Sequence, residues 1–142
     1  MYKEILLPVD LQDPDSWRKS VADAQDLARA FDSTVHVMTV VPSYQMSIVG
    51  SFFPDDFEEK LLATARTQLH EFVKEQLDAA LRGQHIVGHG SVYEEVLRVA
   101  EEIKADLIVL GASRPMAGQL LPGPNAARIA GHAHCSVIVV RN

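Results

Sequence analysis

Three short stretches of the sequence combine residue types that suit the binding of a small ligand. Asp10 directly follows an apolar run, where its carboxylate could cap a helix, bind a metal ion or accept a hydrogen bond from a ligand. In Gly111-Ala112-Ser113-Arg114 the glycine lets the backbone approach a ligand closely, and the arginine could pair with phosphate oxygens. Gly123-Pro124-Asn125-Ala126 resembles a helix start, whose free amides attract anions, although Pro124 removes one donor. Structural roles stay open for all three stretches: a turn or cap, a solvated loop charge and a proline-initiated helix.

The elements that must position these residues follow two alternating patterns. Short, unbroken apolar runs predict strands that are buried on both faces of a sheet. The predicted strands are Ile5–Val9, Thr34–Val41, Gln84–Val87, Leu107–Leu110 and Val137–Val140.

Helical spacing of apolar residues fills the segments between the strands. Asp13 and Pro14 predict an N-cap and a first turn, and a longer helix is expected from about Asp55 to Leu81. The capping-box spacing of Ser91 and Glu94 predicts a third helix. A last, short helix is expected from near Pro124 until before Cys135.

This βαβαβαβαβ order predicts a single α/β domain over residues 1–142, built as a doubly wound parallel sheet of five strands. In such sheets, ligands bind outside the carboxyl ends of the strands. The residues that arrive at that edge are Val9-Asp10, Val40-Val41, Gly88–Gly90 and Gly111–Arg114, with Gly123-Pro124-Asn125 opposite them. Two long loops, Val41–Pro54 and Ala112–Pro122, lie at the same edge and are either functional or simple covers of the sheet.

Composition narrows the classes of partner. The chain has 142 residues, is 47% hydrophobic and carries a net charge of −6, which argues against a general binder of nucleic acid. Its one cysteine, Cys135, suits a reducing compartment. No signal peptide and no apolar run of the ~18 residues that a membrane span needs is visible. The expectation is a soluble cytoplasmic protein without a membrane partner.

The sequence lacks the motifs of several well-known binding and catalytic sites. No Gly-Lys-Ser/Thr follows the glycines, and the first strand leads into Val9–Asp13, which holds no glycine of a dinucleotide fingerprint. The six histidines lack zinc-ligand spacing, and His132 is expected to cap a helix C-terminus instead. Cys135 is expected to be a buried small residue, and no catalytic Ser/His/Asp triad can be assembled. A receiver domain would need an Asp after the third strand, where His89 stands.

Taken together, motifs along the whole chain resemble the universal stress protein family. They are Tyr2–Asp10, Gly90-Ser91-Val92, Asp106–Gly111, Gly111–Arg114, Gly123-Pro124-Asn125-Ala126-Ala127 and His132–Arg141. The resemblance implies strand order 3-2-1-4-5 and an architecture like that of the adenine nucleotide α-hydrolases. The Arg114-Pro115 variant, together with Asn125-Ala126-Ala127, resembles one bacterial subgroup of the family's nucleotide-binding branch. In that subgroup, however, a serine normally follows the glycine at the position of Pro124.

The resemblance also implies a site for an adenine nucleotide: ATP, ADP or AMP, with Mg²⁺ on the phosphates. It places Asp10 and Val40 at the adenine, Gly111 at the ribose, and Gly123 with Asn125 and Ala126 at the phosphates. The candidate nucleotide-binding residues are Pro8, Val9, Asp10, Val40, Leu110, Gly111, Arg114, Gly123, Pro124, Asn125 and Ala126. Because Pro124 supplies neither an amide nor a hydroxyl donor, weaker triphosphate binding is expected, with a preference for AMP or ADP or no nucleotide at all.

Three functions remain open from the sequence. The first is a stress-response binding module that acts as a homodimer through Val137–Arg141, an apolar strand at the sheet edge, together with a protein partner of unknown identity. The second is an interaction protein of the same family that binds no nucleotide. The third is a hydrolytic enzyme, which would need a Ser/Gly phosphate loop where Asp10–Asp15 stands. The expectation is therefore that the protein is not an enzyme.

Overall fold

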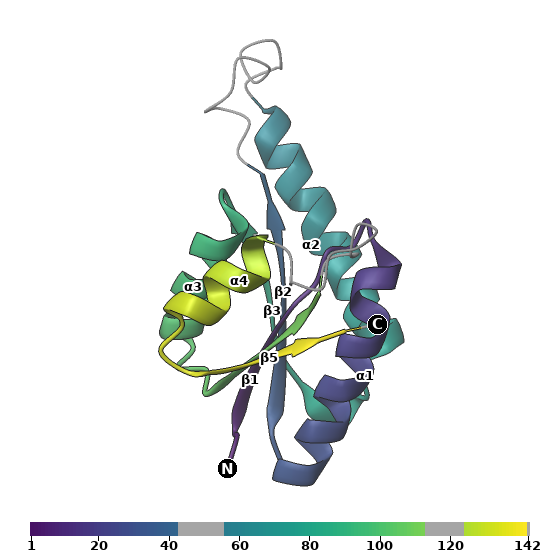
Figure 1. Cartoon of the computed structure of the whole chain (residues 1–142). Helices are drawn as coiled ribbons and strands as arrows, with labels where there is room; N and C mark the ends of the chain where they lie inside the picture. The colour runs from purple at the N-terminus through teal and green to yellow at the C-terminus, as the bar shows by residue number, and fades with distance from the viewer. Residues whose placement is uncertain (43–55, 113–123, 142) are drawn as a thin grey trace.

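The five strands form one parallel sheet. The computed structural model describes residues 1–42, 56–112 and 124–141 (Figure 1). In chain order the elements are β1 (Glu4–Pro8), α1 (Pro14–Phe31), β2 (Thr34–Val41), α2 (Phe57–Gln76), the 3₁₀ turn η2 (Ala79–Leu81), β3 (Arg82–His89), α3 (Val92–Glu102), β4 (Leu107–Gly111), α4 (Pro124–His132) and β5 (Ser136–Val140). The strand order is β3-β2-β1-β4-β5, which confirms the predicted doubly wound α/β class and the 3-2-1-4-5 order.

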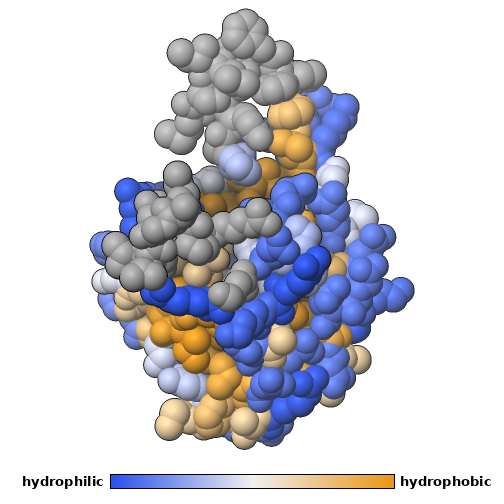
Figure 2. Space-filling model, turned by 45° about the vertical axis from the view of Figure 1, so that its right-hand side comes forward, coloured by the Kyte–Doolittle hydropathy of each residue, from blue (hydrophilic) through white to orange (hydrophobic). Residues whose placement is uncertain are grey.

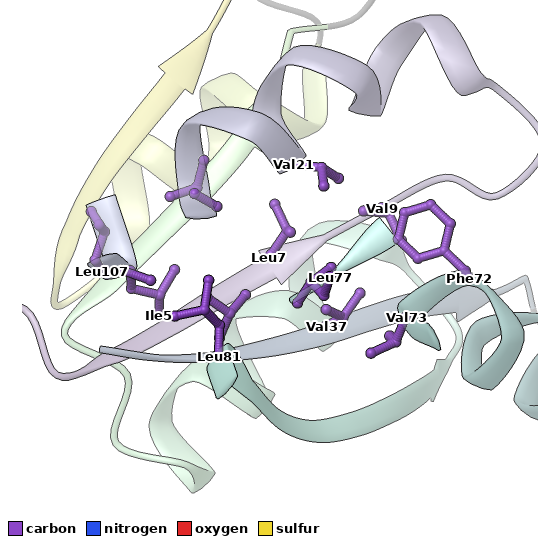
Figure 3. Close-up of a cluster of buried hydrophobic side chains, with 14 of the residues drawn as sticks. Ile5, Leu7, Val9, Val21, Val37, Phe72, Val73, Leu77, Leu81 and Leu107 are labelled. Atoms are coloured by element: carbon purple, nitrogen blue, oxygen red, sulfur yellow. The ribbon is translucent and has the colours of Figure 1, made fainter. Parts of the chain in front are cut away.

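Alternating side chains of the strands build two cores, one on each face of the sheet. Ile5, Leu7 and Val37 face α1 and α2, where they pack with residues such as Phe72 (Figure 3). Leu6 and its neighbours face the opposite way, toward α3 and α4. Helices on both faces explain why β1, β2 and β4 read as unbroken apolar runs, since neither face of these central strands meets water. The arrangement leaves the carboxyl ends of β1, β2 and β4 together at one edge of the sheet.

The second helix ends earlier than predicted. α2 stops at Gln76, Leu77 is extended, and only a 3₁₀ turn follows, whereas the sequence pattern predicted a helix to Leu81. The Gln25 side chain of α1 causes the break, because it donates to the Gln76 carbonyl (2.9 Å) and accepts from the Asp78 amide (2.9 Å). A carboxylate oxygen of Asp78 then accepts from the Ala80 amide, which starts the 3₁₀ turn.

The predicted helix caps are partly right. Asp13 and Ser91 occupy the N-cap positions of α1 and α3, but neither side chain makes a capping hydrogen bond. The capping-box prediction is therefore wrong in its bonding: Glu95, not Glu94, reaches back, and it accepts from the His89 amide at 2.9 Å. His132 behaves as predicted, because its Nδ1 lies 2.9 Å from the Arg128 carbonyl in the last turn of α4.

Cys135 is half-buried rather than fully buried, just before β5. Burial, followed by the nearby charge of Asp106, raises the pKa of its thiol. A thiol with a raised pKa is mostly protonated and therefore a poor nucleophile at neutral pH.

Candidate functional site

A cavity of about 760 Å³ opens at the carboxyl ends of the strands. The ends of β1, β2 and β4, the first turns of α1, the N-terminal half of α2 and the start of α4 surround it. Its volume lies within the range of roughly 300–1,000 Å³ that small-molecule sites occupy. The position is the one that a doubly wound sheet offers to ligands.

Most of the predicted site residues line this cavity. Those that do so are Pro8, Val9, Asp10, Val40, Leu110, Gly111, Asn125 and Ala126. Pro124 is the first residue of α4, and nothing further is described of its side chain. Arg114 and Gly123 lie outside the described residues, as does most of the two long loops, Val41–Pro54 and Ala112–Pro122. The structure thus brings together strand ends and a helix start that are far apart in the sequence.

Asp10 is held in a tight turn directly after β1. Its Oδ1 accepts a hydrogen bond from the Gln12 amide at 3.0 Å, and its carbonyl accepts from the Asp13 amide at 3.1 Å. The preceding residue, Val9, donates its amide to the Met38 carbonyl at 2.8 Å and so fixes the turn to β2. The turn role that the sequence left open is therefore present, and the exposed carboxylate also lines the cavity.

Gly111 is required by packing of the protein against itself. A Cβ atom at this position would lie 1.9 Å from the carbonyl oxygen of Ser16 in the first turn of α1. That obstacle is backbone, so it cannot rotate away as a side chain could. The sequence reasoning explained this glycine by the approach of a ligand, whereas the structure shows that α1 makes the close approach.

Charge is unevenly distributed around the cavity. Among the described residues that line it, Asp10 and Asp13 are the only charged ones, and both are acidic. At the opposite side α4 begins, where the amides of Asn125 and Ala126 belong to a helix N-terminus with its partial positive charge. A ligand with one anionic end is therefore favoured with that end at α4 and its neutral part near β1.

The sequence reasoning missed the part of the cavity that α1 and α2 form. Trp17, Leu61 and Ala65 lie at helical spacing with other apolar residues, and the structure places them at the cavity wall. Thr64 and Gln68 of α2 accompany them. The signal available in the sequence was the spacing of residues 61, 64, 65 and 68, which puts them on one helix face. In Figure 2, the region below the uppermost grey atoms, where α2 begins, shows apolar residues on one side and hydrophilic residues on the other.

Two further findings concern metals and membranes. In the described parts of the chain, no three or more His, Cys, Asp or Glu side chains are grouped so that they could hold a metal ion. None of the described helices combines the length and the apolar character that crossing a membrane requires.

The sheet and its cavity define a class, the doubly wound α/β proteins that carry a ligand cavity at the carboxyl ends of their strands. Within that class, the model of the universal stress protein family matches residues 1–141. Universal stress protein G of Shigella flexneri is 36% identical over 144 residues, which cover 99% of this chain and 100% of the relative. Its counterpart in Salmonella typhimurium is 34% identical over the same shares of both chains. The chain belongs to the universal stress protein family, as its motifs predicted.

Solved structures show the same fold. The hypothetical protein MJ0577 gives a TM-score of 0.81 at 21% identity, covering 100% of this chain and 97% of that one. A universal stress protein in complex with cAMP gives a TM-score of 0.65 at 22% identity, covering 99% and 97% of the two chains.

Proposed function

We propose that this protein is a stress-response module of the cytoplasm that binds an adenine nucleotide in the cavity at the carboxyl ends of its strands. The observation that carries the proposal is the position of the cavity, which joins the strand ends to the N-terminus of α4. The solved relative that holds cAMP supports an adenine nucleotide as the ligand class. The family membership supports the role in stress, and the single cysteine suits a reducing compartment.

The charges around the cavity favour one orientation of the nucleotide. The phosphates lie at the start of α4, near the amides of Asn125 and Ala126, and away from Asp10. The base lies toward the ends of β1 and β2, where Val40 and Asp10 line the cavity. Pro124 lacks an amide hydrogen, so α4 offers one donor fewer than other helix starts do. AMP or ADP is therefore the expected ligand in preference to ATP, with Mg²⁺ on the phosphates where there are several.

The proposed output is a change of interaction rather than turnover. We propose that two copies of the chain pair through β5, which ends the strand order of the sheet and carries three half-buried apolar residues, Val137, Ile138 and Val139. An edge strand with unpaired backbone groups is a surface on which another strand can form. The nucleotide then modulates contacts of this dimer with a protein partner, and any hydrolysis of ATP is slow and incidental.

The test begins with the protein as purified. Denaturing it should release AMP, ADP or ATP in near-stoichiometric amount, identified by absorbance and mass, and calorimetry of the emptied protein should rank AMP and ADP above ATP. Restoring a hydroxyl and an amide with Pro124→Ser should strengthen ATP binding, while Pro124→Ala, which restores only the amide, separates the two donors. No released nucleotide and no thermal shift with millimolar ATP, ADP or AMP would refute the proposal. Sedimentation equilibrium over a wide range of concentration tests the dimer separately.

The second candidate is an interaction protein of the same family that binds no nucleotide. Pro124 is the observation that favours it, because the residue removes an amide donor where phosphates would bind. Dimerisation without nucleotide binding in the experiments above would support this candidate.

A further inference from the structure

Trp17 lines the cavity and carries an unpartnered hydrogen-bond donor. It is the only tryptophan of the chain, it lies in the first turns of α1, and its ring packs edge-on against Phe72 with 4.7 Å between centroids. Its Nε1 is buried, and no described residue supplies an acceptor within hydrogen-bond distance. Burying an N–H without an acceptor is unfavourable, and tryptophan N–H groups usually find a partner when buried. An acceptor from the adjoining cavity would remove this cost once a small shift of the indole opened Nε1 to the cavity.

The wall around Trp17 lies on one face of the sheet only. Leu61, Thr64, Ala65 and Gln68 form one face of α2 and line the same cavity as Trp17. α1 and α2 cover one face of the sheet, whereas Ala126 and its neighbours in α4 pack on the other (Figure 1). The part of the cavity lined by Trp17 and these four α2 residues is called the α1–α2 compartment below. It is separate from the helix N-terminus at which phosphates are proposed to bind.

The α1–α2 compartment is lined by uncharged side chains, which suit a neutral ligand. Trp17, Leu61 and Ala65 offer apolar surface, while Thr64 and Gln68 are polar and uncharged. The charged residues that line the cavity among those described, Asp10 and Asp13, would repel an anion. Apolar walls with a few convergent polar groups are typical of small-molecule sites.

We propose that the α1–α2 compartment binds a small, neutral and mostly apolar molecule that carries a carbonyl oxygen, and that this oxygen accepts a hydrogen bond from Trp17 Nε1–H. The ligand binds beside a nucleotide and does not take its place. The site would let one protein respond to two chemically different molecules, a nucleotide at α4 and a carbonyl compound between α1 and α2.

A pair of probes of nearly equal shape isolates the hydrogen bond. Acetophenone carries a carbonyl group where α-methylstyrene carries a CH₂ group, so apolar contacts are almost the same for both. Because the chain has one tryptophan, its indole N–H gives a single, directly assignable signal in a ¹H–¹⁵N correlation spectrum. The expected result is that acetophenone binds about fivefold more tightly than α-methylstyrene and moves the indole proton downfield, as one added neutral hydrogen bond would do.

Two sets of variants locate the probe. Trp17→Phe keeps an aromatic ring but removes the N–H, so it should abolish the preference between the probes. Thr64→Phe should fill the compartment and block both probes, whereas Thr67→Phe, on the same helix but outside the cavity lining, should leave binding unchanged. Unfolding curves identify any variant that does not fold, and the comparison of the two probes on the unaltered protein decides the question without variants.

Repeating the titration with excess AMP separates this proposal from the proposed function. Unchanged affinity for acetophenone, whether or not AMP itself binds, supports an independent compartment. Equal affinity for the two probes, an unmoved indole signal, or displacement of acetophenone by AMP would overturn the proposal, the last because the compartment would then belong to the nucleotide. In the first two cases, Trp17 Nε1–H would bond to water or have no acceptor at all.

Discussion

The two ends of the sheet differ in how completely their polar groups are paired. At the amino ends of the strands, the Asp106 carboxylate accepts the amides of Lys3 (2.8 Å) and Glu4 (3.0 Å). The buried His36 ring is held on both sides there: its Nδ1 accepts from the Gln84 amide at 2.9 Å, so its Nε2 carries the proton and donates to Glu4. Gly83 leaves room for this ring, because a Cβ there would lie 2.5 Å from Nδ1. These bonds tie β1, β2 and β3 together at the end of the sheet away from the cavity.

At the carboxyl ends the same sheet leaves a cavity and an unused donor. The cavity of about 760 Å³ lies there, together with the exposed carboxylate of Asp10 and the buried, unpaired Nε1 of Trp17. The two ends of the sheet therefore have different tasks. Side-chain hydrogen bonds close one end and stabilise the strand register, while the other end leaves open volume for a ligand. Four predictions test how strict this division is.

The largest effect on stability is expected at Gly111, which lies at the cavity but also packs against α1. Gly111→Ala should lower the free energy of unfolding by about 3 kcal/mol, because the new methyl group meets the Ser16 backbone carbonyl and neither partner can move easily. Urea denaturation measures the loss. Gly131→Ala in α4, where a Cβ meets nothing within 4 Å, is the matched control and should be neutral or stabilising by up to about 1 kcal/mol. A Gly111→Ala protein as stable as the parent would refute the packing role of this glycine.

The next largest effect on stability is expected at the amino ends of the strands. His36→Leu should cost about 2 kcal/mol of stability, because it leaves the Gln84 amide without its acceptor in a mostly buried site. Glu4→Gln should cost less, since the Glu4 side chain is 41% exposed and an amide oxygen can still accept from His36. Calorimetry with AMP should give the same affinity for all three proteins. A reduced affinity of the His36→Leu protein for AMP would show that the two ends of the sheet are not independent.

The sequence alone was sufficient for the sheet and for the rim residues near the strand ends. Unbroken apolar runs predicted parallel strands that are buried on both faces, and hence the meeting of Asp10 with Gly111 at one edge of the sheet. The strand order came from the family resemblance and is confirmed. The early end of α2 could not be predicted, because a side chain of α1, Gln25, causes it across the structure. The packing role of Gly111 was missed for the same reason: the group that it accommodates, Ser16, belongs to another element. Local patterns predict elements, whereas contacts between elements decide helix ends and cavity walls.

The third prediction concerns a charge added beside the cavity, at a position where it should not destabilise the fold. Asn125→Asp places a carboxylate in the first turn of α4, where acidic residues stabilise a helix by a few tenths of a kcal/mol. If the nucleotide phosphates bind there, the same charge should weaken binding by about 1 kcal/mol, or roughly fivefold, with a larger loss for ATP than for AMP. Asn125→Ala removes the amide without adding charge and serves as the control in the same calorimetric titration. Equal affinities for all nucleotides in both variants would place the phosphates elsewhere.

The smallest effect is expected between the two ends, where β3 faces the middle of α2. There the Nδ1 atoms of His70 and His85 lie 3.3 Å apart, and burial, followed by the charges of His70 and Arg82, lowers the pKa of His85. The unfolded chain therefore binds a proton at His85 more readily than the folded chain does. Stability contributed by the neutral ring is complete above the ordinary pKa of 6.5 and is lost as the pH falls below it. His85→Gln should flatten the fall of the unfolding free energy between about pH 6.5 and 5, measured by urea denaturation.

The matched control for His85 is His134→Gln. His134 is exposed and lies 3.5 Å from Glu101. Replacing it should leave the fall of the unfolding free energy with acid unchanged, in contrast to His85→Gln. If His85→Gln instead steepens the fall, the two facing rings share a proton and hold α2 against β3 in acid. Protonation would then stabilise the contact between α2 and β3 instead of weakening it.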